Sequence, residues 1–343
     1  MKTRVSFSAF CLVVYCAVVF CTAAPALQAA TYRTKNFVVT AQSPAVAEKM
    51  AKRAEFLRED LARFWLGKPL PNWFKRCSIK IVLNNGEPGG QTNFIFNRGE
   101  VYGWDMEAYG SEDGIYESVL PHEITHTILA SYFRTPVPRW ADEGAATFTE
   151  GPSERAKYQN MLQKFLRNKQ GIPIDQLMLM TEYPKNPLPL YAQGSSLAEF
   201  MIRQRGPLVF VLFVEQSMKE GASLTALVRE HYGYESMRAL HNDWVAWVSD
   251  GMPAFLGTNL KQENDRAAVA AVVSNYPPAS AATSAASATE TKTAEPTGTP
   301  VEGTANVTYA NGEAPTVQLP RPKANLIYRT PDMRQIKDGK GSF

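Results

Sequence analysis

Apolar side chains recur every three or four positions between residues 44 and 66, which is the period of an amphipathic helix. Ser43 and Pro44 begin this stretch with a residue that caps helices and a proline suited to the first helical turn. Gly67 follows the last apolar position, so we expect the helix to end near residue 66.

Short runs rich in β-branched and aromatic residues lie on both sides of this helix and predict strands. The clearest runs are residues 34–41, 79–83, 92–96 and 100–106. A turn that contains a glycine, residues 97–99, separates the last two runs. These two strands are therefore expected to form a β-hairpin.

From residue 111 onward the pattern is mainly helical. Ser111 and the two acidic residues after it predict the start of a helix that extends to about residue 131. Pro121 lies inside this helix and has no N–H to donate, so we expect a kink or a restart directly before His122. Four prolines predict a loop over residues 172–189. Further helices are expected at residues 141–150, 153–169, 207–218, 224–231 and 235–249.

The strongest chemical signal is the run His122-Glu123-Ile124-Thr125-His126. Residues four apart on a helix lie on one face, so both imidazoles can present a nitrogen to one metal ion. Glu123 is one step round the helix and can reach a water next to that metal. Zinc suits such a site because it accepts nitrogen and carboxylate ligands in tetrahedral geometry. A catalytic zinc takes three protein ligands, so this run needs a third ligand from elsewhere.

Glu143 can supply that ligand, seventeen positions after His126, with room between them for a turn and a second helix packed back on the first. The two stretches HEITH and WADEGAA resemble the gluzincin group of zinc metallopeptidases, and most of all its small peptidase-MA-like members. The resemblance implies that His122, His126 and Glu143 bind one Zn²⁺ per chain and that Glu123 is the general base. Asp142, next to the third ligand, is expected to support neighbouring groups.

The same resemblance implies an α+β fold over residues 31–260, in which a small mixed β-sheet is followed by a mainly helical, zincin-like part. It also suggests Tyr191, at the head of a helix after the third ligand, as the hydroxyl that stabilises the oxyanion. The alternative for Tyr191 is an ordinary buried aromatic. In gluzincins an edge strand beside the metal pairs with the extended peptide substrate, and residues 101–106 are the candidate by their order in the chain. The alternative for this strand is a plain sheet edge.

Residues 1–30 are predicted to be a secretory signal peptide. Lys2 and Arg4 give a positive start, an apolar run continues to Ala24, and small residues precede the expected cleavage site. The protein is therefore expected to be secreted, or to lie in the periplasm or cell envelope. The apolar run is long, so an uncleaved membrane anchor is the alternative.

Composition adds three points. The formal net charge is +3, of which the predicted signal carries +2, and no basic stripe indicates a nucleic-acid partner. Cys77 is the one cysteine outside the predicted signal, so no internal disulfide is expected, and we interpret it as a core residue. Residues 261–343 are predicted to be a low-complexity, disordered tail, because residues 279–312 offer few large apolar side chains to bury.

The expected function is hydrolysis of peptide bonds, with a peptide or protein as substrate and membrane contact only if the N-terminal segment is retained. The sequence indicates neither the substrate nor an oligomeric state. Two other classes of function remain open. One is a catalytically silent module that binds zinc, and the other is a structural envelope protein in which HEITH is incidental. Metal content and a peptide library would separate the three.

Overall fold

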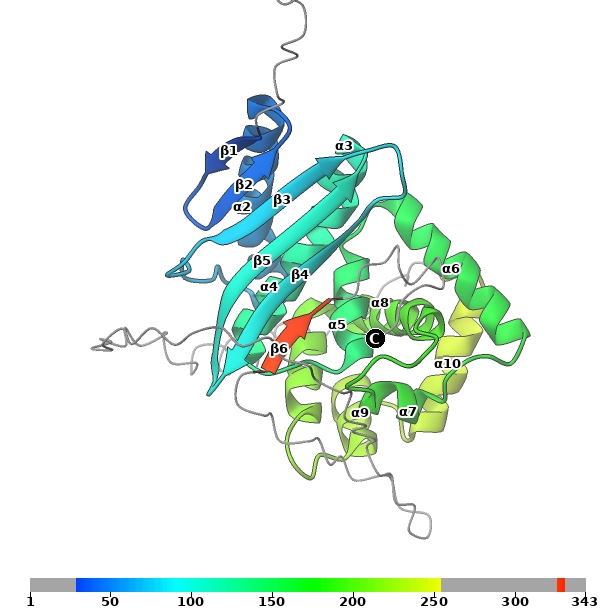
Figure 1. The fold of residues 1–343 in the computed structure, drawn as a ribbon. Helices are drawn as coiled ribbons and strands as arrows, with labels where there is room; N and C mark the ends of the chain where they lie inside the picture. The colour runs from blue at the N-terminus through cyan, green and yellow to red at the C-terminus, as the bar shows by residue number, and fades with distance from the viewer. Residues whose placement is uncertain (1–28, 254–325, 331–343) are drawn as a thin grey trace, which may run out of the picture.

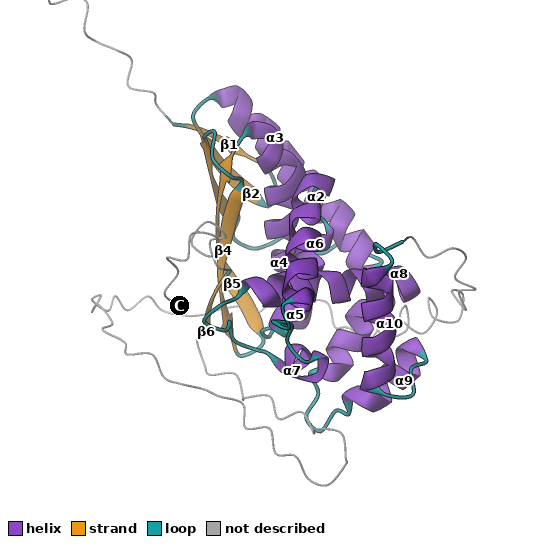
Figure 2. Cartoon of the chain, turned by 90° about the vertical axis from the view of Figure 1, so that its right-hand side faces the viewer, coloured by secondary structure: helices purple, strands orange, loops and turns teal. Residues whose placement is uncertain are grey.

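The computed structural model describes residues 29–253 and 326–330. Within these ranges the chain forms a six-stranded mixed sheet followed by a mainly helical part, which confirms the predicted α+β class. Figure 2 shows the sheet edge-on, with the helices on one of its faces. The predicted signal peptide lies outside the described residues except at its end, and so does most of the predicted tail.

The sheet joins segments from both ends of the chain (Figure 1). Its order is β1-β2-β3-β5-β4-β6, in which β2–β3 and β3–β5 are parallel pairs and the others are antiparallel. The strands are β1 (Ala30–Arg33), β2 (Phe37–Ala41), β3 (Cys77–Leu83), β4 (Gly89–Asn97), β5 (Glu100–Gly110) and β6 (Leu326–Arg329).

The strand order corrects the prediction about the strand nearest the substrate. Residues 101–106 belong to β5, which lies between β3 and β4 in the sheet order, although within this range only Asp105 and Met106 pair with β3. The β4–β5 hairpin is present as predicted, and Arg98 and Gly99 at its tip have φ values of 51° and 78°. Strand β4 lies on the far side of β5 and pairs in turn with β6, which is the outer strand on this side of the sheet.

Helix α2 (Pro44–Leu66) has the predicted bounds. The Ser43 side chain accepts a hydrogen bond from the N–H of Val46, and Gly67 ends the helix with φ 71°. Its apolar face packs on the sheet and on α4, and Trp65 is fully buried in that core. Cys77, at the start of β3, is also fully buried, as predicted.

The helix that carries the HEITH run begins in three steps. A single turn, α3 (Glu112–Gly114), leads into a π-helical turn, η1 (Ile115–Val119), and then into α4 (Leu120–Phe133). Pro121 therefore lies in the first turn of α4, where a missing N–H costs little. The π-turn before α4 is a local departure from α-helical geometry in a continuously helical backbone, and such turns are frequent beside functional sites, whereas the kink or restart directly before His122 stays a prediction.

The remaining helices follow the predicted pattern with two differences. Residues 172–189 contain a short helix, α7, and the two helices expected around residue 200 form one element, α8, broken at Gly206 (φ 82°, ψ 167°) before Pro207. The bounds are α5 (Arg139–Phe148), α6 (Pro152–Arg167), α7 (Ile174–Leu179), α8 (Leu188–Ser217), α9 (Leu224–Tyr232) and α10 (Met237–Ser249). Across the described residues, no helix combines the length and apolar character needed to span a membrane.

The prediction that residues 261–343 are disordered is wrong for residues 326–330. Leu326, Ile327 and Tyr328 form an apolar run, and together with Arg329 they make β6, antiparallel to β4. The averaged composition of the tail conceals this run because it is only a few residues long. The Tyr328 side chain is 3% exposed, so β6 belongs to the folded core.

Candidate metal centre

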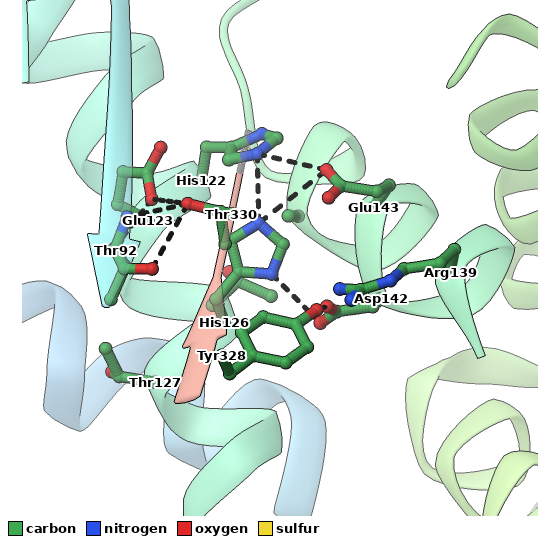
Figure 3. A network of polar contacts seen from close by, with 12 residues as sticks. Thr92, His122, Glu123, His126, Thr127, Arg139, Asp142, Glu143, Tyr328 and Thr330 are labelled. Carbon is green, nitrogen blue, oxygen red and sulfur yellow. Dashed lines mark hydrogen bonds and ion pairs between the residues drawn. The ribbon is translucent and has the colours of Figure 1, made fainter. Parts of the chain in front are cut away.

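Helices α4 and α5 bring the three predicted ligands together. His122 and His126 lie one turn apart on α4, and their Nε2 atoms are 3.1 Å apart. Glu143 on α5 directs Oε2 to 3.6 Å from the first of these nitrogens and 3.7 Å from the second. All three side chains are buried, and the three atoms converge on one point (Figure 3).

The Glu143 carboxylate is only half satisfied. Oε1 accepts a hydrogen bond from the hydroxyl of Tyr183, whereas Oε2 has no hydrogen-bond partner in the described part of the chain, although it is buried. A buried carboxylate oxygen without a partner is costly unless a cation is bound there. The group His122, His126 and Glu143 could therefore hold a metal ion.

A second carboxylate supports each histidine from behind. Nδ1 of His122 donates to Glu150 Oε1 at 2.6 Å, and Nδ1 of His126 donates to Asp142 Oδ1 at 2.9 Å. A carboxylate acceptor keeps a proton on Nδ1, so the lone pair of the neutral ring lies on Nε2, the atom that faces the other ligands. This arrangement is the usual one behind metal-binding histidines.

The carboxylates around the two histidines favour positive charge at this centre. Burial disfavours a charged imidazole at His122, but the nearby Glu143 carboxylate and the hydrogen bond with Glu150 outweigh it and raise the pKa of His122 well above its usual value. The pKa of His126 is raised too, because Asp142 and Glu143 outweigh the effect of burial. In turn, burial opposes ionisation of Glu143, yet the two histidines hold its pKa below the usual range. Metal binding would thus release protons from the histidines.

Glu123 lies beside the ligand triangle, on the side of strand β4. Its Oε2 accepts a hydrogen bond from Thr92 Oγ1 at 2.6 Å, and the side chain is 3% exposed. Burial raises the pKa of this carboxyl, with partial opposition from the two histidines. Oε1 lies beside Gly90, where a Cβ atom would come within 2.9 Å of it. Because Gly90 has no side chain, the Glu123 carboxylate can lie close to it.

The tyrosine nearest the ligands is not the predicted one. Tyr183, from the segment after α7, makes the hydrogen bond with Glu143, and its ring stacks on Tyr191 with centroids 6.1 Å apart. Tyr191 is buried behind it on α8, and its ring also stacks on Tyr158. The oxyanion role of Tyr191 stays a prediction, and Tyr183 is the residue that the sequence did not identify.

Arg139, at the start of α5, lies beside the candidate metal centre. Its guanidinium lies 4.3 Å from the ring centroid of Tyr183 and 4.4 Å from that of Tyr328. Burial disfavours its charge, but the surrounding tyrosines and carboxylates outweigh this effect and raise its pKa. Arg139 therefore supplies one fixed positive charge beside the buried carboxylates of Asp142 and Glu143.

A pocket opens beside Glu123 and His122, between the start of β4 and helix α6. Gly89 and Gly90 form one wall, and Glu150 and Tyr158 lie opposite. The pocket thus adjoins both the ligand set and the separate carboxylate.

Only weak patterns in the sequence indicate the remaining residues that contact the site. Glu150 lies two residues past the end of α5, in the connection to α6, so the helical period did not indicate its position. Thr92 lies at the site because β4 pairs antiparallel with β5, and the residues around Thr92 do not indicate this pairing. Asp142 was expected to support its neighbours, and its contact with His126 agrees with that expectation.

Comparisons of the chain with protein-family models, with curated proteins and with solved structures found no match.

Proposed function

We propose that the protein is a zinc-dependent metallopeptidase, similar to gluzincins, which hydrolyses peptide bonds outside the cytoplasm. The observation that carries the proposal is the convergence of three ligand atoms next to a separate buried carboxylate. His122, His126 and Glu143 converge on one point, and Glu123 lies beside them on the same turn of α4. The predicted signal peptide supports the location.

The ligand set favours zinc over other ions. Two imidazole nitrogens and one carboxylate oxygen are typical of catalytic zinc sites, which keep one position open. Ligand atoms at about 2.0–2.1 Å from a tetrahedral zinc are about 3.3–3.4 Å from one another. The three sides of the ligand triangle measure 3.1, 3.6 and 3.7 Å, close to these values. Magnesium and calcium prefer sites made of oxygen atoms alone.

When bound, zinc would polarise the scissile carbonyl and lower the pKa of the attacking water. Glu123 takes a proton from that water and delivers it to the amine that leaves. A carboxyl whose pKa burial has raised is a stronger base than an exposed one, which suits this role. Thr92 fixes the carboxylate through Oε2, so Oε1 faces Gly90 and the pocket.

The surrounding residues position the ligands. Glu150 and Asp142 fix the ring orientation of the two histidines, and Tyr183 holds the second oxygen of Glu143. Because these contacts are buried or partly buried, the ligand atoms need little reorganisation when the metal binds.

Metal content and one substitution test the proposal. Purified residues 31–343 should contain about one zinc per chain, and His126→Ala should lose it. Glu123→Ala should retain zinc but should cleave none of the peptides in a library that the parent protein cleaves. A folded parent protein without zinc, or an undiminished rate in Glu123→Ala, would contradict the proposal.

A further inference from the structure

Strand β6 comes from near the end of the chain and occupies the outer edge of β4. It pairs antiparallel, with Phe94 opposite Tyr328 and Phe96 opposite Leu326. Residues 254–325, which lie outside the described residues, separate it from the rest of the fold. An extended segment on an open strand edge is one of the common ways in which proteins bind peptides.

Tyr328 anchors β6 by its side chain. The ring stacks on Phe94 with centroids 4.6 Å apart and an interplanar angle of 13°, and Arg139 lies over its other face. The hydroxyl donates a hydrogen bond to Asp142 Oδ2. Ile327, the next residue along, is 71% exposed. One side chain of β6 therefore fills a defined aromatic and polar site, whereas its neighbour contacts little.

Thr330, directly after β6, reaches the general base of the proposed mechanism. Its N–H donates to Thr92 O at 3.0 Å, and its Oγ1 accepts from Thr92 N at 2.6 Å. The same hydroxyl lies 3.3 Å from Glu123 Oε2 (Figure 3). The chain's own C-terminal segment thus contacts the carboxylate that would activate water.

The edge of β4 continues past the end of β6. Residues 89–92 form the first part of β4, and Gly89 and Gly90 line the pocket beside His122 and Glu123. A peptide paired along the whole strand would therefore run from the Tyr328 site, past Glu123, into this pocket. Segment 326–330 fills one half of that path.

We propose that the outer edge of β4 is a peptide-binding edge and that residues 326–330 are its intramolecular occupant. The ligands are extended peptides with an aromatic residue two positions before serine or threonine, as Tyr328 and Thr330 are spaced. That such peptides are substrates, and that β6 holds back hydrolysis, rests on the proposed function. The binding of such peptides to the β4 edge does not depend on the proposed function.

Replacing β6 with a bound peptide changes the main-chain hydrogen bonding of β4 little. A peptide that pairs with β4 can make the same kinds of main-chain hydrogen bonds, so the exchange leaves the number of ladder bonds unchanged. A tethered segment competes at an effective concentration typically on the order of millimolar. Weak or dilute peptides would thus be excluded, and those that fit the Tyr328 site would enter.

Cleavage of the tether after folding tests the inference. A recognition sequence for a specific protease, inserted after residue 295 of the full chain, turns residues 296–343 into a separate fragment. The probe is a fluorescein-labelled peptide of residues 324–332, followed by anisotropy and checked for integrity by mass spectrometry. Cleavage and removal of the fragment should increase probe affinity at least about tenfold, and the remaining protein should stay folded by circular dichroism.

Two substituted probes provide matched controls. Tyr328→Ala in the probe should weaken binding at least about tenfold, because stacking and the Asp142 hydrogen bond are lost, whereas Ile327→Ala should bind like the parent probe. Unfolding when the fragment leaves, a fragment that excess probe does not displace, unchanged probe affinity after cleavage, or equal binding of the two probes would each overturn the inference. Probe binding without hydrolysis of any peptide would leave the inference standing and remove the proposed function. Hydrolysis that cleavage of the tether does not alter would leave the proposed function standing and overturn the claim that β6 holds back hydrolysis.

Discussion

Replacing Glu150 with glutamine tests whether the carboxylates behind the histidines contribute to zinc binding. Glu150 Oε1 accepts a hydrogen bond of 2.6 Å from His122, and the glutamate side chain is only 8% exposed. Glutamine has nearly the same shape and can still accept this hydrogen bond, but it lacks the charge. The substitution therefore isolates the contribution of the charge.

The expected loss follows from the strength of such bonds. Hydrogen bonds to charged groups contribute about 1.5–3 kcal/mol and neutral ones about 0.5–1.5 kcal/mol, so removing the charge should cost about 1–1.5 kcal/mol. At about 1.4 kcal/mol per factor of ten, zinc should bind about tenfold more weakly. Glu150→Ala, which removes the acceptor as well, should approach the roughly 100-fold loss seen for such partners.

Protonation of His122 gives the prediction a pH dependence. Glu150 helps to raise the pKa of His122, so its loss lets the ring release its proton more readily. This effect favours zinc and offsets part of the loss while the ring is protonated, and it disappears as pH rises through the pKa of His122 in the folded protein. The loss of affinity should therefore grow as pH rises, which a comparison of about pH 7 with about pH 9 tests.

Zinc affinity is measured by competition with a chromophoric chelator at both pH values. Glu154→Gln is the matched control, because Glu154 borders the same pocket but pairs with Lys157 at 2.8 Å and contacts no histidine. Its zinc affinity should equal that of the parent protein. Equal losses in the two variants, or an undiminished affinity in Glu150→Gln, would refute the reasoning.

Two further substitutions separate catalysis from metal binding. Gly90→Ala should lower the rate of peptide hydrolysis at least about tenfold at unchanged zinc content, because the new Cβ would lie 2.7 Å from Val119 Cγ1 and 2.9 Å from both Glu107 O and Glu123 Oε1, so that the strand or the carboxylate must shift; a parent-like rate per bound zinc would contradict the assigned position of the base. Tyr191→Phe should lower turnover roughly tenfold or more with zinc retained if its hydroxyl stabilises the oxyanion, and full activity would remove that role.

Local signals in the sequence were sufficient for the helices and for the ligand set. Helix α2 agreed with prediction at both ends because its N-cap serine and terminal glycine act within one turn of the residues they affect. The spacing of the two histidines is likewise a property of a single helix. Glu143 required only that the next helix pack back on the first, which two prolines in the connection favoured.

Contacts between distant segments could not be predicted from such local signals. Chain order suggested that β5 is the outer strand, but strand order depends on which neighbour pairs with β3, a choice made by the whole sheet. Thr330 contacts Thr92 across 238 positions, and β6 offers only four residues as a signal. Such a strand is recognisable only when its partner edge is known.

Asp142 connects the ligand set with strand β6. One of its carboxylate oxygens accepts from His126 and the other from Tyr328, so metal site and strand site share a buried group. A carboxylate held on both sides is more fixed than one held on a single side, and the orientation of the histidine ring depends on it. Any change that β6 makes in zinc affinity must therefore be matched by an equal change that zinc makes in the docking of β6. We therefore expect occupancy of the β4 edge and occupancy of the proposed metal centre to be coupled, which zinc titrations with and without residues 326–330 would measure.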